Sequence, residues 1–175
     1  MIRYRMLRNA GEIFLTGMLA TVAQPAHAQE ITAAYVMTVI HDRAAGDDVI
    51  SGAYGQAIES LTANAAKRSS RFAASNNLCV AYTKTNRLPE AEQACNAALR
   101  VSKAKYASWY DVSSKRDFYA VALSNRGVIR AVSGDIEQAR QDFRAAMKFS
   151  STLTAPTENL AVLEAKTTEN LSARE

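Results

Sequence analysis

Histidine, cysteine and glycine are scarce in this sequence, which counts against most familiar catalytic and metal-binding sites. The 175 residues include 2 histidines, 2 cysteines and 7 glycines. The scattered glycines form neither a phosphate-binding loop nor the Gly-x-Ser-x-Gly turn of a hydrolase. The histidines and cysteines lack the spacing of zinc ligands. We therefore expect no cofactor, no metal and no enzymatic activity.

Long apolar runs and blocks of like charge are also missing. The apolar run at residues 13–23 is far shorter than the roughly 20 residues that span a bilayer. No block of about five or six like charges suggests an interaction tail. Part of the formal net charge of +4 comes from three arginines near the N-terminus. We therefore expect neither a nucleic-acid partner nor a stable membrane anchor in the mature chain.

Residues 1–28 have the order of a secretory signal peptide. A basic start, a short apolar run and a small-x-small cleavage site follow one another: Arg3, Arg5 and Arg8; residues 13–23; Ala26-His27-Ala28. We predict a Sec-type signal that is cleaved after Ala28, so that the mature chain begins at Gln29 in the periplasm or the secreted space. A retained anchor and a disordered tail are the alternatives.

Residues 29–51 are expected to form an extended or irregular arm. They include the strand formers Tyr35, Val36, Val39 and Ile40, and no helix cap is evident. A short helix is the alternative. A polar, glycine-containing break follows at residues 44–48.

Residues 76–103 predict a helical hairpin. Small or apolar residues recur at intervals of three and four on both sides of a break at residues 86–89: Leu78, Ala81 and Tyr82, then Ala91, Ala94, Cys95, Ala98 and Leu99. Pro89 suits the first turn of the second helix. This stretch resembles a tetratricopeptide repeat (TPR), in which Asn-Leu-small, a Tyr four residues after the Leu, and paired alanines mark two packed helices.

The resemblance extends to both neighbouring segments. Residues 52–66 match a second helix alone, and Ala57 precedes Ala91 by 34 residues, the repeat length of the family. Residues 123–150 match a whole unit, although Arg126 and Arg130 replace the expected Leu and Tyr. Ala139 follows Ala91 by 48 residues, so an insert is expected near residues 104–116. Residues 157–171 are expected to form a capping helix.

The resemblance implies an all-α fold, a short α-α superhelix of TPR-like helical hairpins over residues 52–171. In this family the first helices line a concave face that binds a protein or peptide. By the resemblance, six residues would face this groove: Asn76, Val80, Thr83, Lys84, Ser124 and Val128. The clamp that chaperone-binding relatives use for a C-terminal carboxylate is not reproduced. A groove that faces only solvent is the alternative.

Aromatic residues are concentrated in and beside the insert, which holds Tyr106, Trp109 and Tyr110. Phe118 and Tyr119 follow, so five of the eleven aromatic residues beyond residue 28 lie here. Tyrosine and tryptophan are enriched in binding hot spots. These side chains are expected either to contact a partner or to fill the gap between units.

Cys79 and Cys95 are predicted to form a disulfide. They lie eight residues on either side of Arg87, near the centre of the hairpin turn, so they face each other at the same level. The oxidising compartment lets such a bond persist. Two free, buried cysteines are the alternative, because packed helices are often too far apart for a bridge.

The function that we expect is a non-catalytic protein- or peptide-binding module, a scaffold or adaptor of the periplasm or secreted space. Its partner is a protein or peptide. A structural accessory domain of an envelope assembly is one alternative. The other is an unrecognised enzyme that uses the polar loop with His41, Asp42 and Asp47, although the adjacent carboxylates of Asp47 and Asp48 are more often solvated in such a loop.

Overall fold

The structure is a computed structural model, which describes residues 4–7, 34–41, 43–63, 71–103 and 112–172. Helices make up most of these residues, so the predicted all-α class is confirmed. The elements are β1 (Tyr4–Leu7), β2 (Met37–Ile40), α2 (Gly46–Ile50), α3 (Tyr54–Ala63), α4 (Arg71–Lys84), α5 (Leu88–Lys103), α6 (Val112–Val132), α7 (Ile136–Phe149) and α8 (Ala155–Ser172).

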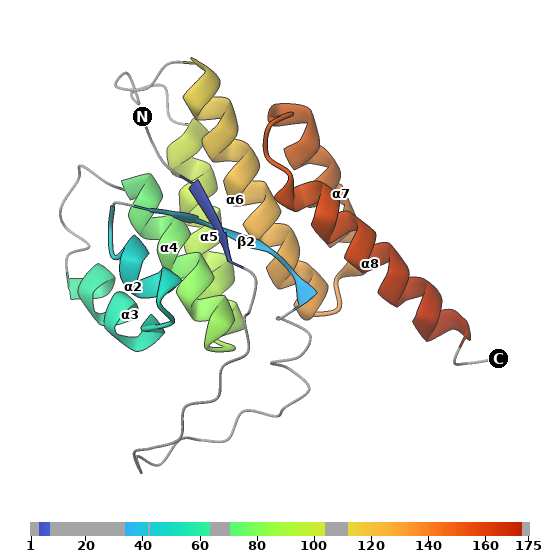
Figure 1. Ribbon diagram of the computed structural model, residues 1–175, viewed down its shortest axis with the longest axis horizontal. Helices are drawn as coiled ribbons and strands as arrows, with labels where there is room; N and C mark the ends of the chain where they lie inside the picture. Colours follow the sequence, from blue (N-terminus) through green and yellow to red (C-terminus); the bar gives the residue numbers. More distant parts are fainter. Residues whose placement is uncertain (1–3, 8–33, 42, 64–70, 104–111, 173–175) are drawn as a thin grey trace, which may run out of the picture.

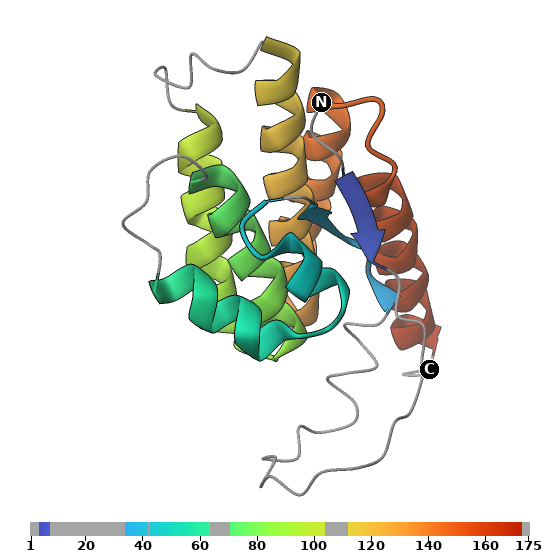
Figure 2. The ribbon, with the colours of Figure 1, turned by 60° about the vertical axis from the view of Figure 1, so that its left-hand side comes forward.

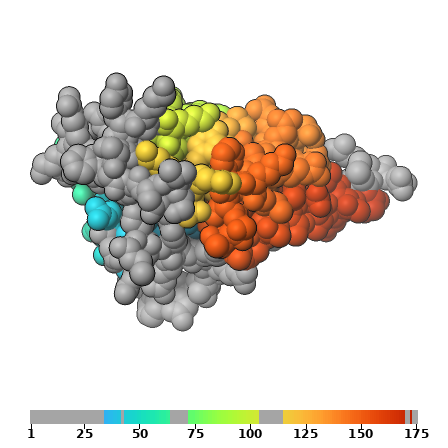
Figure 3. Space-filling model, turned by 90° about the horizontal axis from the view of Figure 1, so that it is seen from above, coloured from blue at the N-terminus to red at the C-terminus, as the bar shows by residue number. Residues whose placement is uncertain are grey.

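Successive helices from α3 to α8 pack side by side in chain order (Figure 1). From above, the surfaces of α5, α6, α7 and α8 follow one another across the molecule (Figure 3). Each helix therefore contacts mainly its neighbours in the chain, and the apolar core lies between adjacent pairs.

Three helix pairs, α2/α3, α4/α5 and α6/α7, share one turn geometry. Gly52, Asn86 and Gly134 have positive φ angles of 84°, 58° and 89°. After each of them, the next amide donates to a carbonyl five residues earlier, which closes the end of a helix. These bonds are Ala53 to Asp48, Arg87 to Tyr82 and Asp135 to Arg130, each 2.8 Å. The three turns are 34 and 48 residues apart, as are Ala57, Ala91 and Ala139.

The prediction of an arm over residues 29–51 needs a correction at its end. Residues 37–40 are extended, as expected, but residues 46–50 form the helix α2. This helix packs on α3 and gives the first hairpin a short first helix, where the sequence indicated only a half repeat. Its five residues carry too little of the three-and-four pattern to be recognised.

Small residues let the paired helices approach closely. Ala57, Ala91 and Ala139 are fully buried. A Cβ atom on Gly127 would lie 2.6 Å from Cε1 of Phe143, so α6 and α7 leave no room for a side chain there. Phe143 fills this space itself and is fully buried.

Arg126 and Arg130, which depart from the repeat pattern, form an ion-pair cluster with Asp142 of α7. Arg126 donates to both carboxylate oxygens at 2.8 Å, and Arg130 donates to one of them at 2.8 Å. Asp142 is 4% exposed. Its hydrogen bonds with Arg126 raise the pKa of that guanidinium. The cluster ties α6 to α7 at positions where a repeat would use apolar side chains.

The predicted disulfide is present between Cys79 of α4 and Cys95 of α5. The two Cα atoms are 5.1 Å apart, within the range that a bridge requires. Helix α5 therefore lies unusually close to α4 at this level, as its small residues allow.

Strand β2 runs across α4 and α6, and β1 pairs with it antiparallel (Figures 1 and 2). The register pairs Tyr4 with Ile40 and Leu7 with Met37. Within the described ranges, no helix has the length and apolar character needed to cross a membrane.

Candidate functional site

The helices α4, α6 and α8 carry a groove, and residues 35–40 of the same chain fill it. The exposed fractions of these six residues lie between 0% and 6%. Met37 and Val39 belong to the same buried apolar cluster as Val80 of α4 and Val128 of α6. The segment is therefore part of the protein core and not a loose arm.

Three asparagines hold the backbone of this segment, one from each helix. Each amide accepts a hydrogen bond from the N–H of one residue and donates another to the C=O of the same residue. The pairs are Asn159 with Val36 (2.7 and 2.8 Å), Asn125 with Thr38 (2.8 and 2.9 Å) and Asn77 with Ile40 (2.9 and 3.0 Å). Every second residue is held because alternate residues of a strand direct their backbone groups to the same side.

The spacing of these asparagines repeats the spacing of the helical hairpins. Asn77 and Asn125 are 48 residues apart, and Asn125 and Asn159 are 34 apart. The same two intervals separate the hairpin turns at Gly52, Asn86 and Gly134, and also the three buried alanines. The three asparagines therefore occupy equivalent positions on α4, α6 and α8, and we call them, together with Asn76, the asparagine ladder.

Asn76 completes the ladder. It donates to the carbonyl of Thr38 at 2.9 Å and accepts from Asn125 at 3.0 Å. All four ladder side chains are fully buried. An unpaired buried polar group costs about 1–3 kcal/mol, so the hydrogen bonds between the ladder and the strand stabilise both.

A tight turn after β2 brings the chain back over the end of the strand. A Cβ atom on Gly46 would lie 2.3 Å from the carbonyl oxygen of Ile40, so only glycine fits. Ala44 and Ala45 have φ angles of 50° and 54°, a region that residues with side chains seldom occupy. Asn77 also donates to the carbonyls of Arg43 and Ala44 at 3.1 Å. The ladder thus holds the turn as well as the strand.

The structure corrects the expectation of an open groove. Five of the six predicted groove residues are buried in the core instead of facing a partner: Asn76, Val80, Thr83, Ser124 and Val128. The sixth, Lys84, is half-buried, and burial lowers the pKa of its ammonium group. The chain's own residues 35–40 occupy the face on which these residues lie.

Sequence reasoning missed Asn77, Asn125 and Asn159 as residues that bind backbone. The signal was available in part, because Asn77 and Asn125 are 48 residues apart, the same interval as Ala91 and Ala139. Asn159 lies 34 residues further on, within a helix rich in Glu, Lys and Thr that resembles a solvated cap. That Asn159 is equivalent to Asn77 and Asn125 is seen only in the structure, where all three bind the same extended segment.

The structure describes two of the three suggested catalytic residues of the polar loop after β2, His41 and Asp47. His41 Nε2 lies 3.2 Å from Asp47 Oδ1, and the Asp47 side chain is 76% exposed. Asp42 lies outside the described residues. Across the part of the chain that the structure describes, no three His, Cys, Asp or Glu side chains are grouped to hold a metal ion.

The suggested aromatic patch of Tyr106, Trp109 and Tyr110 also lies outside the described residues. The two aromatic residues beside it pack against other helices. Phe118 stacks on Phe72 with ring centroids 4.4 Å apart, and Tyr119 meets Phe149 edge-on at 4.7 Å.

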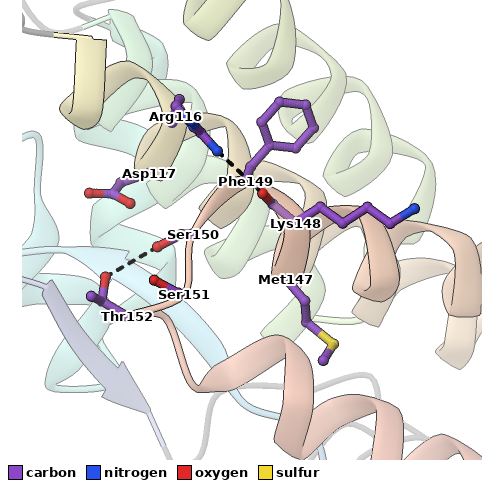
Figure 4. A pocket seen from close by; sticks show the side chains of 8 residues that line it. All are labelled: Arg116, Asp117, Met147, Lys148, Phe149, Ser150, Ser151 and Thr152. Carbon is purple, nitrogen blue, oxygen red and sulfur yellow. Dashed lines mark hydrogen bonds between the residues drawn. The ribbon is translucent and has the colours of Figure 1, made fainter.

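A shallow pocket lies between the start of α6 and the end of α7 (Figure 4). Its volume is about 420 Å³, and Arg116 donates across it to the carbonyl of Lys148 at 3.4 Å. Met147 and Phe149 beside it are each 39% exposed. Charges of both signs and apolar groups are mixed in the lining, so it has no chemistry as definite as that of the groove: Arg116, Asp117, Met147, Lys148, Phe149, Ser150, Ser151 and Thr152.

Comparison with known proteins finds no relative of this chain. The chain matches no protein-family model, no curated protein and no solved structure. The groove and the segment within it are therefore the features from which a function is inferred.

Proposed function

We propose that this protein is an exported, non-catalytic adaptor of the TPR type that binds an extended segment of a partner protein. One observation carries the proposal: the asparagine ladder binds the backbone of an extended polypeptide, which in this structure is the chain's own segment, residues 36–40. Asparagine amides pair with both backbone groups of Val36, Thr38 and Ile40. Such a groove is chemically suited to polypeptide and not to a small molecule.

The repeat assignment is supported by three independent sets of positions. Hairpin turns, buried alanines and ladder asparagines each recur after 34 or 48 residues. The shorter interval equals the TPR repeat length, and the longer one equals that length with an insert of about 14 residues. A short α-α superhelix, with α8 as the first helix of an incomplete further unit, accounts for all three sets.

Export is supported by the order of residues 1–28 and by the disulfide between Cys79 and Cys95. Disulfides form and persist in the periplasm and in secreted proteins and are rare in the cytosol. The two observations are independent, because one concerns the N-terminus and the other a helical hairpin.

A structural accessory domain of an envelope assembly is the second candidate. The observation that favours it is the groove itself, which is already filled by residues 35–40. A protein of this kind would be a permanent part of a larger complex and would not bind free peptides.

A panning experiment with a library of linear peptides separates the two candidates. The exported chain is immobilised, and a helical protein of similar size and charge serves as the control target. An adaptor enriches peptides that bind it with micromolar dissociation constants and do not bind the control. If no such peptide is found, and the chain migrates only within a large envelope complex on size-exclusion chromatography, the accessory role replaces the adaptor role.

A further inference from the structure

Strand β2 has two edges, and the asparagine ladder occupies only one of them. The backbone groups of residues 36, 38 and 40 point to the ladder. Because backbone groups alternate along a strand, those of Met37 and Val39 point to the opposite edge. This outer edge pairs with β1, which sets Arg5 opposite Val39 and Leu7 opposite Met37.

The strand that covers the outer edge belongs to the predicted signal peptide. Residues 4–7 form β1, and cleavage after Ala28 would remove them. The N–H and C=O groups of Met37 and Val39 would then lose their strand partner. A strand edge left open in this way is a template for pairing with another chain.

We propose that the outer edge of β2 is a strand-acceptor site, to which an extended segment of a partner protein adds antiparallel in the register that β1 shows. The inference rests on the proposed function and names the surface that carries it out. In strand addition, main-chain hydrogen bonds provide the affinity. The partner segment would contribute at least four extended residues and no proline at the two positions opposite Met37 and Val39, where its N–H groups are needed.

The ladder makes this edge rigid before a partner arrives. Six hydrogen bonds from Asn77, Asn125 and Asn159 fix β2 in its extended form. Binding then requires ordering of the incoming segment alone, which lowers the entropic cost of association. The groove thus holds one extended segment, residues 36–40, and presents the outer edge of that segment to a second one.

The length of β2 favours a partner segment over a second copy of this chain. Four paired residues on each side bury far less surface than the roughly 1,200–2,000 Å² of a stable protein interface. An extended segment of a partner can bind weakly and transiently over such a small area.

The test uses the exported chain, whose N-terminus is first established by mass spectrometry. The probe is a synthetic peptide with the sequence of residues 1–10, MIRYRMLRNA. We expect it to bind and to shift the NMR signals of the Met37 and Val39 amides. N-methylation of the peptide at Arg5 and Leu7, which face β2, should weaken binding about tenfold or more, because two hydrogen bonds are lost. The matched control, N-methylation at Tyr4 and Met6, should change it less than about twofold.

Several results would overturn the inference. These are an exported chain that retains Met1, no binding of the peptide, equal effects of the two methylation patterns, or a dimer in sedimentation that the peptide dissociates. The proposed function is tested separately, with the peptides enriched by panning. If these bind but leave the Met37 and Val39 amides unchanged, the adaptor role stands and the strand-acceptor site does not.

Discussion

At the scale of single residues, asparagine is the side chain that suits this groove. Its amide carries a donor and an acceptor in one plane, so it pairs with the N–H and C=O of one extended residue. Glutamine has the same groups on a longer, more mobile stem, and aspartate lacks the donor. Asn125 shows the economy of the arrangement, because it binds Thr38 on one side and Asn76 on the other.

Replacing Asn125 with alanine should therefore destabilise the protein by roughly 2–4 kcal/mol, because the N–H of Thr38 and the side-chain oxygen of Asn76 both lose their partner in a buried site. The carbonyl of Thr38 keeps its hydrogen bond from Asn76. Asn96 on α5 is a matched control. It is half-buried and accepts one hydrogen bond from Arg126, so its replacement with alanine should cost less than about 1.5 kcal/mol. Urea unfolding measures both values. An Asn125→Ala variant as stable as the wild type would show that the ladder is not needed.

Gly127 offers a second test at this scale. A methyl group there would overlap the ring of Phe143, so Gly127→Ala should cost about 1–3 kcal/mol or more. Gly55 in α3 has open space around it, and Gly55→Ala should stabilise the helix by up to about 1 kcal/mol. Thermal unfolding of the two variants should thus shift in opposite directions. Equal shifts would contradict the packing of α6 on α7.

The carboxylate of Asp142 stabilises two arginines, so its loss should be costly. Asp142→Asn leaves Arg126 and Arg130, which are 19% and 17% exposed, without their counter-charge. We expect a loss of about 2–4 kcal/mol in the free energy of unfolding, below the usual range for a fully buried pair. Glu137→Gln removes an exposed pair with Arg140 and should cost less than about 1 kcal/mol. Similar losses for the two variants in urea unfolding would mean that the cluster of Asp142 stabilises the protein no more than an exposed ion pair does.

At the scale of elements, the hairpin of α4 and α5 is the part that the sequence predicts best. The spacing of its apolar residues predicts both helices, and the positions of Cys79 and Cys95 on either side of the turn predict the disulfide. Contacts within a hairpin are local, so a periodic pattern is enough to reveal them. The ion pairs of Arg126 were not predicted, because their partner lies on another helix and no period links the two.

The position of residues 35–40 against α4, α6 and α8 could not be predicted from the sequence, for a related reason. Their hydrogen bonds reach side chains 37, 87 and 123 residues away. An extended segment has no helical period to show which face it covers, and its apolar residues fit a strand, an edge or a core equally well. Only the 34- and 48-residue spacing of the asparagines marked the groove.

The disulfide should stabilise the hairpin by about 3 kcal/mol, the value for a closed loop of about 15 residues in the chain-entropy model. We expect the Cys79→Ala/Cys95→Ala double variant to lose about this much in urea unfolding. Thiol titration of the exported protein, denatured without reductant, should find no free thiol, since both cysteines are bonded. Two titratable thiols per chain would contradict the bond and weaken the case for export.

At the scale of the whole molecule, the helices form a frame whose three equivalent positions meet on one extended segment. Helices α4, α6 and α8 each supply one of the three equivalent asparagines, so together they bind every second residue along the strand. Removal of residues 1–28 would take away β1, the strand that pairs with the outer edge of β2. Packing of α4, α6 and α8 around residues 36–40 would thus also fix β2 in the form that a partner segment binds.

Amide hydrogen exchange, resolved by residue in the exported chain, tests the central claim most directly. The amides of Val36, Thr38 and Ile40 donate to the ladder, so we predict that they exchange slowly. Those of Met37 and Val39 face the outer edge, which cleavage after Ala28 would leave open, and should then exchange much faster. This alternation is the predicted result. Fast exchange along all of residues 36–40 would contradict the account, because it would mean that the asparagine ladder does not hold the strand.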